Sequence, residues 1–302
     1  MRRLLLCTLL FAAIATTAEA AGPPLPSAYS GRVGATAPGG KERLVTRRVR
    51  DGTLVRALRR TDGRVLRARV ISGRWAVPAV TITGATTGLS ADGRTLVLGR
   101  PVRRFPPTRT DLAILSTQRL VVRRRIALQG FYAVDAISPD GRWVYLIEYP
   151  GEDVLDYHVR ALDTRTGRLD ARYVVDPRNP DEQMGGLPFT RAVSPDGRWA
   201  YTLYSGGEET FIHALDTVNR TAACIDLEML PAQADLSTTR LALRPGRIEV
   251  RQAGTLVATV DTETFAVAEP GEEDASALTA GSGVAVIGAL AALLMRSVEP
   301  GT

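Results

Sequence analysis

The chain has 302 residues, of which 45% are hydrophobic and 23% charged, and its formal net charge is +6. It can bury a sizeable core, which excludes a largely disordered, a collagen-like or a polytopic membrane protein. Its two cysteines exclude a disulfide-rich scaffold.

The N-terminal twenty residues have the order of a secretory signal peptide. Two arginines precede an apolar run over residues 4–15, and Ala18-Glu19-Ala20 follows as a small-residue cleavage site. We expect residues 1–20 to be removed on export and residues 21–27 to form a linker. An uncleaved membrane anchor is the alternative. Cleavage leaves Cys224 as the only cysteine, which we interpret as a small buried hydrophobic residue.

One motif is repeated three times in the middle of the chain, at residues 88–98, 136–146 and 192–202. Each copy has an apolar strand, a tight turn and a second strand, which predicts a β-hairpin. Aspartate caps the turn and glycine accepts a positive φ. These structural turn residues are Asp92, Gly93, Asp140, Gly141, Asp196 and Gly197.

A second repeated element follows each hairpin, at residues 111–117, 158–164 and 211–217. Two hairpins make one four-stranded propeller blade, and the spacing of the motif serines fits the length of such a blade. Weaker copies lie at residues 53–71 and 236–267. The sequence therefore predicts an all-β propeller over residues 28–268, with about five four-stranded blades. The expected blades are 28–72, 75–129, 130–176, 187–228 and 232–268.

The Ser-Pro-Asp-Gly-Arg hairpins, each followed by a strand that ends in Asp-Thr, resemble the YVTN-type and WD-like β-propeller repeat families. The resemblance implies the fold but not the activity, because such propellers serve as enzymes, sensors, scaffolds and assembly factors. Five blades is a low number for these families. Either a degenerate blade or residues 28–50 would then complete the ring.

The connections between strands differ in length on the two faces of the predicted disc. The Ser-x-Asp-Gly and Asp-Thr turns are short, whereas residues 100–111, 149–156, 176–188 and 205–210 form long loops on the opposite face. Binding residues concentrate on long loops, so we expect a binding site there; tolerated surface insertions are the alternative. The candidate binding residues of this long-loop face are Arg103, Arg104, Arg109, Glu152, Asp153, Asp181 and Glu182.

Three polar residues are expected on innermost strands beside the central channel. Thr87, Asp135 and Arg191 each lie three residues before a motif serine. Asp135 and Arg191 form either a contact that satisfies two partly buried charges or a ligand site at the mouth of the channel.

Charge is divided unevenly along the chain. Residues 1–145 hold 25 of the 38 basic residues and 8 of the 32 acidic ones, a net charge of +17 that leaves −11 for the rest. We expect the first two blades to be basic and the last three acidic. Outside the cell, a basic surface suits anionic lipid headgroups, anionic wall polymers or acidic proteins, not nucleic acid. Basic and acidic flanks also allow self-association.

Residues 275–295 are uncharged and follow the acidic linker 269–274. Their length fits a transmembrane helix with residues 296–302 as a cytoplasmic tail; a loosely packed C-terminal helix is the alternative. The predicted localisation is therefore the outer side of the cytoplasmic membrane, with the protein exported and anchored there.

No recognised catalytic motif or cysteine–histidine cluster is present, so we expect no cofactor and no metal. His158 and His213 lie on corresponding strands, where ordinary packing is favoured over a metal site with a carboxylate. The sequence predicts a non-catalytic extracytoplasmic propeller that binds a protein or an anionic envelope component through its long-loop face. The alternatives are a lactonase-like propeller hydrolase with a metal in the channel near Asp135, and a sensor domain or accessory subunit.

Overall fold

The structure is a computed structural model that describes residues 34–102, 105–151, 155–181, 184–205, 209–231 and 235–271. These residues form antiparallel sheets without an α-helix, which confirms the all-β prediction. The five sheets agree with the predicted number of blades, although the second sheet has three strands instead of the predicted four. The predicted signal peptide and C-terminal helix lie outside the described residues. Within the described ranges, no helix long and apolar enough to cross a membrane occurs.

The sheets follow one another along the chain, and each keeps its strands in sequence order. The first contains β1 (Ala35–Thr36), β2 (Glu42–Val49), β3 (Gly52–Arg59) and β4 (Val65–Ile71). The second contains β5 (Thr95–Gly99), β6 (Arg109–Ser116) and β7 (Val121–Gln129). The third contains β8 (Phe131–Ile137), β9 (Trp143–Tyr149), β10 (His158–Asp163) and β11 (Arg168–Val174). The fourth contains β12 (Leu187–Val193), β13 (Trp199–Ser205), β14 (Phe211–Asp216) and β15 (Thr221–Asp226), and the fifth β16 (Thr239–Arg244), β17 (Arg247–Gln252), β18 (Thr255–Asp261) and β19 (Val267–Ala268).

The repeated Ser-Pro-Asp-Gly-Arg turn is held by hydrogen bonds within five residues. In the third sheet, the Ser138 hydroxyl donates to the Asp140 carboxylate at 2.6 Å and accepts from the backbone N–H of Trp143 at 2.9 Å. The same carboxylate accepts from the Arg142 N–H, and Gly141 adopts a φ of 72°. The motif therefore specifies the turn locally, because only glycine takes this φ at low cost.

A second set of hydrogen bonds ties this turn to the Asp-Thr turn of the same sheet. Thr164 donates its hydroxyl to the Gly141 carbonyl at 2.9 Å. The other two copies repeat the bond, from Thr117 to Gly93 and from Thr217 to Gly197. Both kinds of short turn consequently lie at one end of each sheet, which we call the short-turn face.

The core consists of the apolar faces of neighbouring sheets packed together. Leu44 and Val55 of the first sheet belong to one buried cluster with Leu96 and Leu115 of the second. Other clusters join the second sheet to the third, the third to the fourth and the fourth to the fifth. Strand alternation therefore leaves each terminal sheet with one face directed away from the other sheets.

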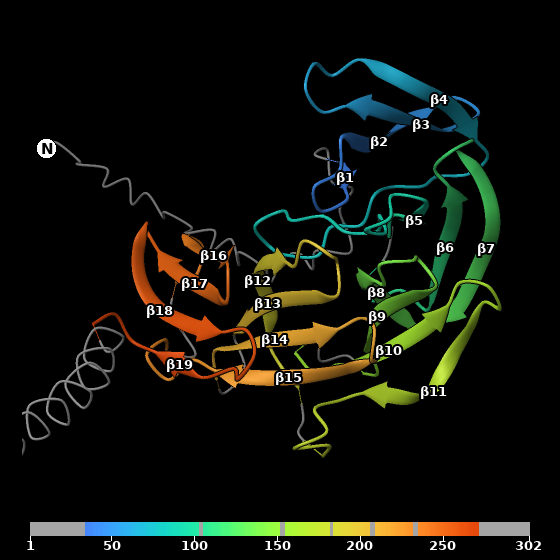
Figure 1. The fold of residues 1–302 in the computed structure, drawn as a ribbon. Helices are drawn as coiled ribbons and strands as arrows, with labels where there is room; N and C mark the ends of the chain where they lie inside the picture. Colours follow the sequence, from blue (N-terminus) through green and yellow to red (C-terminus); the bar gives the residue numbers. More distant parts are fainter. Residues whose placement is uncertain are drawn as a thin grey trace, which may run out of the picture.

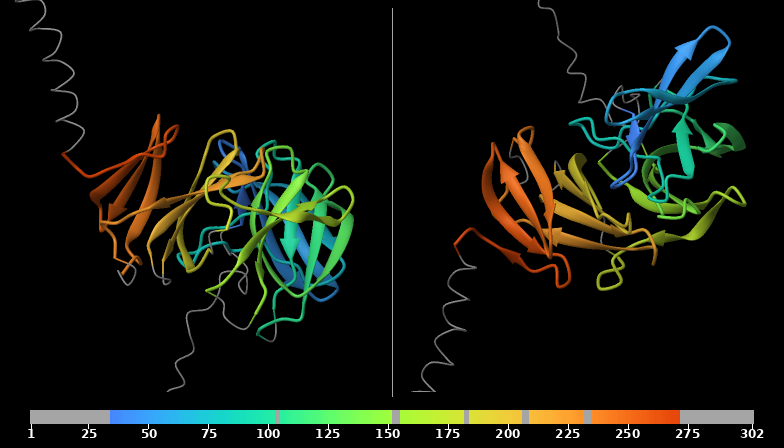
Figure 2. Two further views of the ribbon diagram at one scale, coloured as in Figure 1. Left: turned by 90° about the horizontal axis from the view of Figure 1, so that it is seen from below. Right: turned by 45° about the horizontal axis from the view of Figure 1, so that its top comes forward.

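The five sheets form an open arc. Figures 1 and 2 show β1–β4 at one end of the arc and β16–β19 at the other, and among the described strands none of the first sheet pairs with one of the last. The predicted ring is therefore not closed by strand pairing.

A short hairpin over residues 79–86 crosses the middle of the arc. The Val80 N–H donates to the Ala85 carbonyl at 2.8 Å within the hairpin. At its tip, the Ile82 N–H donates to the Pro188 carbonyl at 2.8 Å, and the Thr83 hydroxyl to the Phe189 carbonyl at 2.6 Å. The hairpin, which precedes β5 in Figure 1, thus joins the second sheet to the start of β12 in the fourth.

Candidate functional site

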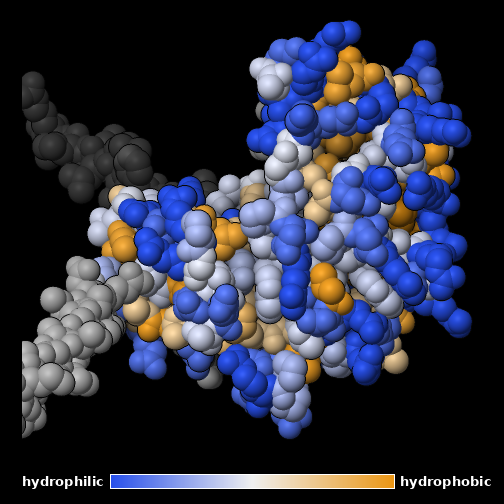
Figure 3. Space-filling model, in the orientation of Figure 1, coloured by the Kyte–Doolittle hydropathy of each residue, from blue (hydrophilic) through white to orange (hydrophobic). Residues whose placement is uncertain are grey.

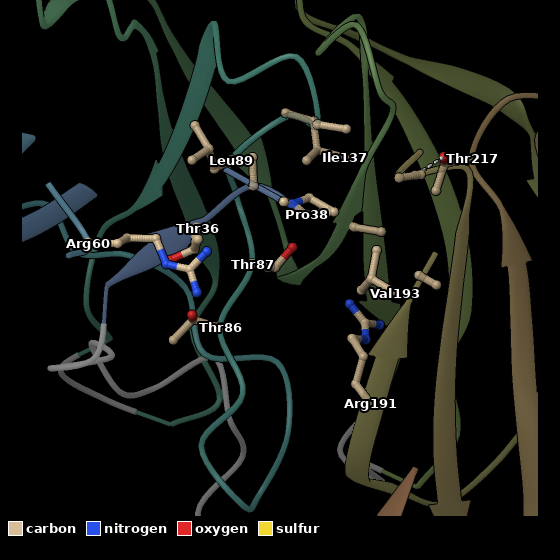
Figure 4. Close-up of a pocket in the computed structure, with 16 residues that line it drawn as sticks. Thr36, Pro38, Arg60, Thr86, Thr87, Leu89, Ile137, Arg191, Val193 and Thr217 are labelled. Atoms are coloured by element: carbon tan, nitrogen blue, oxygen red, sulfur yellow. Dashed lines mark hydrogen bonds between the residues drawn. The ribbon is translucent and has the colours of Figure 1, made fainter. Parts of the chain in front are cut away.

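A cavity of about 340 Å³ is lined by residues of the first, second, third and fourth sheets. Figure 4 shows Arg60 on one side of it and Arg191 on the other, with Thr36, Thr86 and Thr87 also in its wall. Apolar side chains such as Leu89 and Ile137 line much of the rest. No aspartate or glutamate belongs to this lining, among the residues that the structure describes.

The cavity lies at the short-turn face of the arc. Ala91, Gly197 and Thr217, which belong to short turns, contribute to its wall. The tip of the hairpin 79–86 lies at the other end, where β12 begins, and only the last residue of the hairpin, Thr86, reaches the cavity wall. The cavity thus lies away from the long-loop face, where the sequence led us to expect binding.

Arg191 is held in place by its neighbours on β8 and β13. Its Nε donates to the Thr202 hydroxyl at 2.8 Å, and its guanidinium donates to both the carboxylate and the backbone carbonyl of Asp135. The Arg191 side chain is 5% exposed and that of Asp135 1%. A guanidinium has five N–H donors, so part of its bonding capacity is left for a group in the cavity.

Sequence reasoning offered a buried contact or a ligand site for these residues, and the structure combines features of both. Asp135 and Arg191 form the ion pair, and Arg191 also lines the cavity together with Thr87. Asp135 itself is fully buried, and its Oδ2 has no hydrogen-bond partner.

Buried aromatic side chains surround the ion pair. Burial raises the pKa of Tyr157 and Tyr204, whose rings stack at 5.2 Å. Burial also lowers the pKa of His213 from 6.5 to about 4, so this imidazole is neutral at pH 7. His213 is buried and its Nε2 has no hydrogen-bond partner.

The two histidines do not share a site. His158 stacks on Tyr173 with 4.3 Å between the ring centroids, whereas His213 is buried in the fourth sheet. Across the described ranges, no three histidine, cysteine, aspartate or glutamate side chains gather as metal ligands. Cys224 is half-buried, beside His213 in the register of β14 and β15.

Most of the candidate residues of the long-loop face lie outside the described residues: Arg103, Arg104, Glu152, Asp153 and Glu182. Arg109 donates from Nε to the Asp111 carboxylate at 3.0 Å, and Arg100 approaches the same carboxylate at 3.1 Å. Asp181 is exposed.

The sequence reasoning missed Arg60, although the repeat contains a signal for it. The Arg60 N–H donates to the Lys41 carbonyl at 2.9 Å, which is the bond that Thr164 and Thr217 make in their own sheets. Arg60 therefore occupies the position of the threonine in the Asp-Thr turn. In the first sheet the threonine hydroxyl is thus replaced by the long, positively charged side chain of Arg60, which lines the cavity.

No family model matches the sequence, and no curated protein matches it. Among solved structures, hydrazine synthase of Kuenenia stuttgartiensis is similar at 14% identity and a TM-score of 0.48, over 76% of this chain and 70% of that chain. The structure of apo AztD from Citrobacter koseri gives 14% identity and a TM-score of 0.39, over 75% of this chain and 58% of that chain.

TolB from Acinetobacter baumannii gives 19% identity and a TM-score of 0.39, over 66% of this chain and 44% of that chain. This chain thus spans less than two thirds of the AztD and TolB chains. At such identities and TM-scores, no activity, ligand or partner transfers to this chain, and its function is argued from its own residues.

Proposed function

We propose that this chain is a non-catalytic β-propeller, exported and held at the cytoplasmic membrane, that binds a protein or an anionic envelope component. The partner presents an anionic group, such as a carboxylate or a phosphate, to the central cavity. The observation that carries the proposal is the pair of arginines, Arg60 and Arg191, on two sides of a cavity to whose lining the described residues contribute no acidic side chain.

The two arginines supply different parts of the recognition. Arg191 is oriented by Asp135, which balances its charge, so it offers directed N–H donors. Arg60 donates from NH1 to the Gly40 carbonyl at 2.7 Å and forms no ion pair within the described part of the chain. Its uncompensated charge favours an anion, and the hydroxyls of Thr36 and Thr87 in the cavity wall add donors, whereas Thr86 already donates its hydroxyl to the Gly34 carbonyl at 2.6 Å.

The lactonase-like alternative needs Asp135 as a metal ligand in the channel. In this structure the Asp135 carboxylate faces a guanidinium, which repels a metal cation. The buried ion pair therefore favours binding over metal-dependent hydrolysis.

The cavity is tested by titrating the full-length chain with inorganic phosphate, against chloride at the same ionic strength, while thermal unfolding is followed. A ligand that binds only the folded state raises the unfolding midpoint. We expect Arg60→Gln to weaken phosphate binding roughly tenfold, because a charge-assisted hydrogen bond is lost. Arg64→Gln, an exposed arginine of the same turn that does not line the cavity, should leave the affinity unchanged. Equal phosphate affinity in wild type and Arg60→Gln would contradict the proposal.

The natural partner is sought by crosslinking and co-purification of the full-length chain from its own membranes, with wild type and Arg60→Gln side by side. A partner retained by wild type and lost by Arg60→Gln supports recognition through the cavity. The long-loop face is tested in parallel by charge reversal of Arg103 and Arg104, and separately of Glu152 and Asp153. Unaltered capture in both of these loop variants would remove the long-loop face from the proposal.

A further inference from the structure

The first sheet lies at one end of the arc, so one of its faces is directed away from the other sheets. On this face Leu58 is buried, whereas Val65 and Val70 are exposed. Leu44 and Val55 point toward the second sheet, so strand alternation directs their neighbours to the opposite side, which we call the outer face of the first sheet. The register places three rows of residues across this face. The rows are Arg43, Leu58 and Val65; Val45, Arg56 and Ala68; and Arg47, Leu54 and Val70.

This outer face alternates arginines with apolar side chains. It contains no acidic residue, and Val65 and Val70 are 46% and 50% exposed. Figure 3 shows apolar residues gathered on this sheet, at the top of the view, within a hydrophilic surround. Exposed apolar side chains, which a partner can bury, therefore lie beside positive charges on this face.

Two of the three arginines of the outer face, Arg43 and Arg47, are exposed and available to a partner. Within the described ranges, Arg43, Arg47 and Arg56 form no ion pair and no side-chain hydrogen bond, and Arg43 and Arg47 are exposed. The Nε of Arg56 is buried without a hydrogen-bond partner at the centre of the face. The described residues supply no acceptor for this donor, and none for the exposed Arg43 and Arg47 of the same face.

The other end of the arc does not supply that acceptor. The outward side of the fifth sheet carries Arg240, Arg244, Arg247 and Arg251, with Glu249 already shared by three of these arginines. Closing the ring would bring these two basic faces together, and like charges repel. The outer face of the first sheet therefore stays open to a different, anionic surface.

We propose that the outer face of the first sheet docks on an anionic phospholipid bilayer, with the exposed Arg43 and Arg47 on headgroup phosphates and the exposed Val65 and Val70 against the acyl boundary. Arginine pairs bidentately with phosphate. The interleaved apolar side chains favour a bilayer over a soluble polyanion, which offers charge without an apolar layer. This contact is separate from the cavity, since none of the nine residues of the outer face lines the cavity.

The test measures binding of the full-length chain to vesicles of phosphatidylcholine alone and of phosphatidylcholine with phosphatidylglycerol. The ratio of the two affinities isolates the charge-dependent part, because any apolar segment of the chain contributes to both. We expect a ratio well above one for wild type, falling at least about fivefold in the double variant Arg43→Gln, Arg47→Gln. Val70→Ser, which keeps the charges, should lower the affinity for anionic vesicles as well.

The matched control removes two exposed arginines of β11, Arg168→Gln and Arg172→Gln, which lowers the net charge of the chain by the same amount. This control should keep the wild-type ratio. An equal fall in both double variants would assign the effect to net charge and overturn the proposal. Displacement from the vesicles by polyglutamate at matched charge, or loss of a dimer in Arg43→Gln, Arg47→Gln during sedimentation, would overturn it in favour of an acidic polymer or a second copy.

Discussion

Replacement of Asp135 by asparagine should destabilise the fold strongly. The substitution keeps the size of the side chain and removes its charge, while Arg191 keeps its own. Both side chains are almost fully buried, at 1% and 5% exposure. Removing one partner of a buried ion pair costs about 3–5 kcal/mol, because the remaining charge loses its compensation without regaining water. This is a large fraction of the 5–15 kcal/mol of free energy that stabilises a typical domain.

The loss is measured by urea unfolding of Asp135→Asn, followed by tryptophan fluorescence. Asp111→Asn is the matched control, because its arginine partners Arg100 and Arg109 are 52% and 55% exposed. We expect that control to lose less than about 1 kcal/mol, as surface ion pairs do. The double variant Asp135→Leu, Arg191→Met should recover most of the lost stability, since it leaves no unpaired charge. A loss below 1 kcal/mol in Asp135→Asn would refute the reasoning.

The repeated turns were predictable because their determinants are local. The Ser194 hydroxyl bonds to Asp196 at 2.5 Å and to the Trp199 N–H at 2.8 Å, all within one hairpin. Glycine at the left-handed position and aspartate as the turn acceptor leave a clear pattern in five consecutive residues. From these turns the five sheets and the all-β class follow.

The cavity was not predictable in the same way, because contacts between distant residues build it. The hairpin 79–86 reaches the fourth sheet through a bond from Thr83 to Phe189, over more than a hundred residues of chain. Residues 79–86 contain neither an aspartate–glycine turn nor a copy of the repeat, so no local sequence pattern predicts that they contact the fourth sheet. Arg60 is different: its departure from the Asp-Thr pattern was visible in the sequence.

The charge division along the chain predicted a basic first blade but missed how charge is arranged on surfaces. Summed charge made the last three sheets acidic, yet the outward side of the fifth sheet gathers four arginines. Alternation along β16 and β17 sorts Arg240, Arg244, Arg247 and Arg251 onto one face, away from the apolar core. The strand register decides which charged residues share a surface, and a sum of charges over half the chain carries no information on the register.

Two further stability measurements test the turns and the buried histidine. Gly141→Ala should lose more stability than Gly63→Ala by about 1 kcal/mol or more: both glycines have φ near 70°, but only at Gly141 would a Cβ lie 2.5 Å from the side chain of Thr95. Equal losses would assign the cost to φ alone. Burial lowers the pKa of His213 to about 4, so below pH 6.5 the unfolded chain binds a proton that the folded chain does not. Stability therefore falls as the pH is lowered from 6.5 towards 4, by up to about 1.4 kcal/mol per pH unit. His213→Phe should flatten this slope and His158→Phe should keep it, as urea unfolding across the pH range will show; an unchanged slope in His213→Phe would place the responsible titration elsewhere.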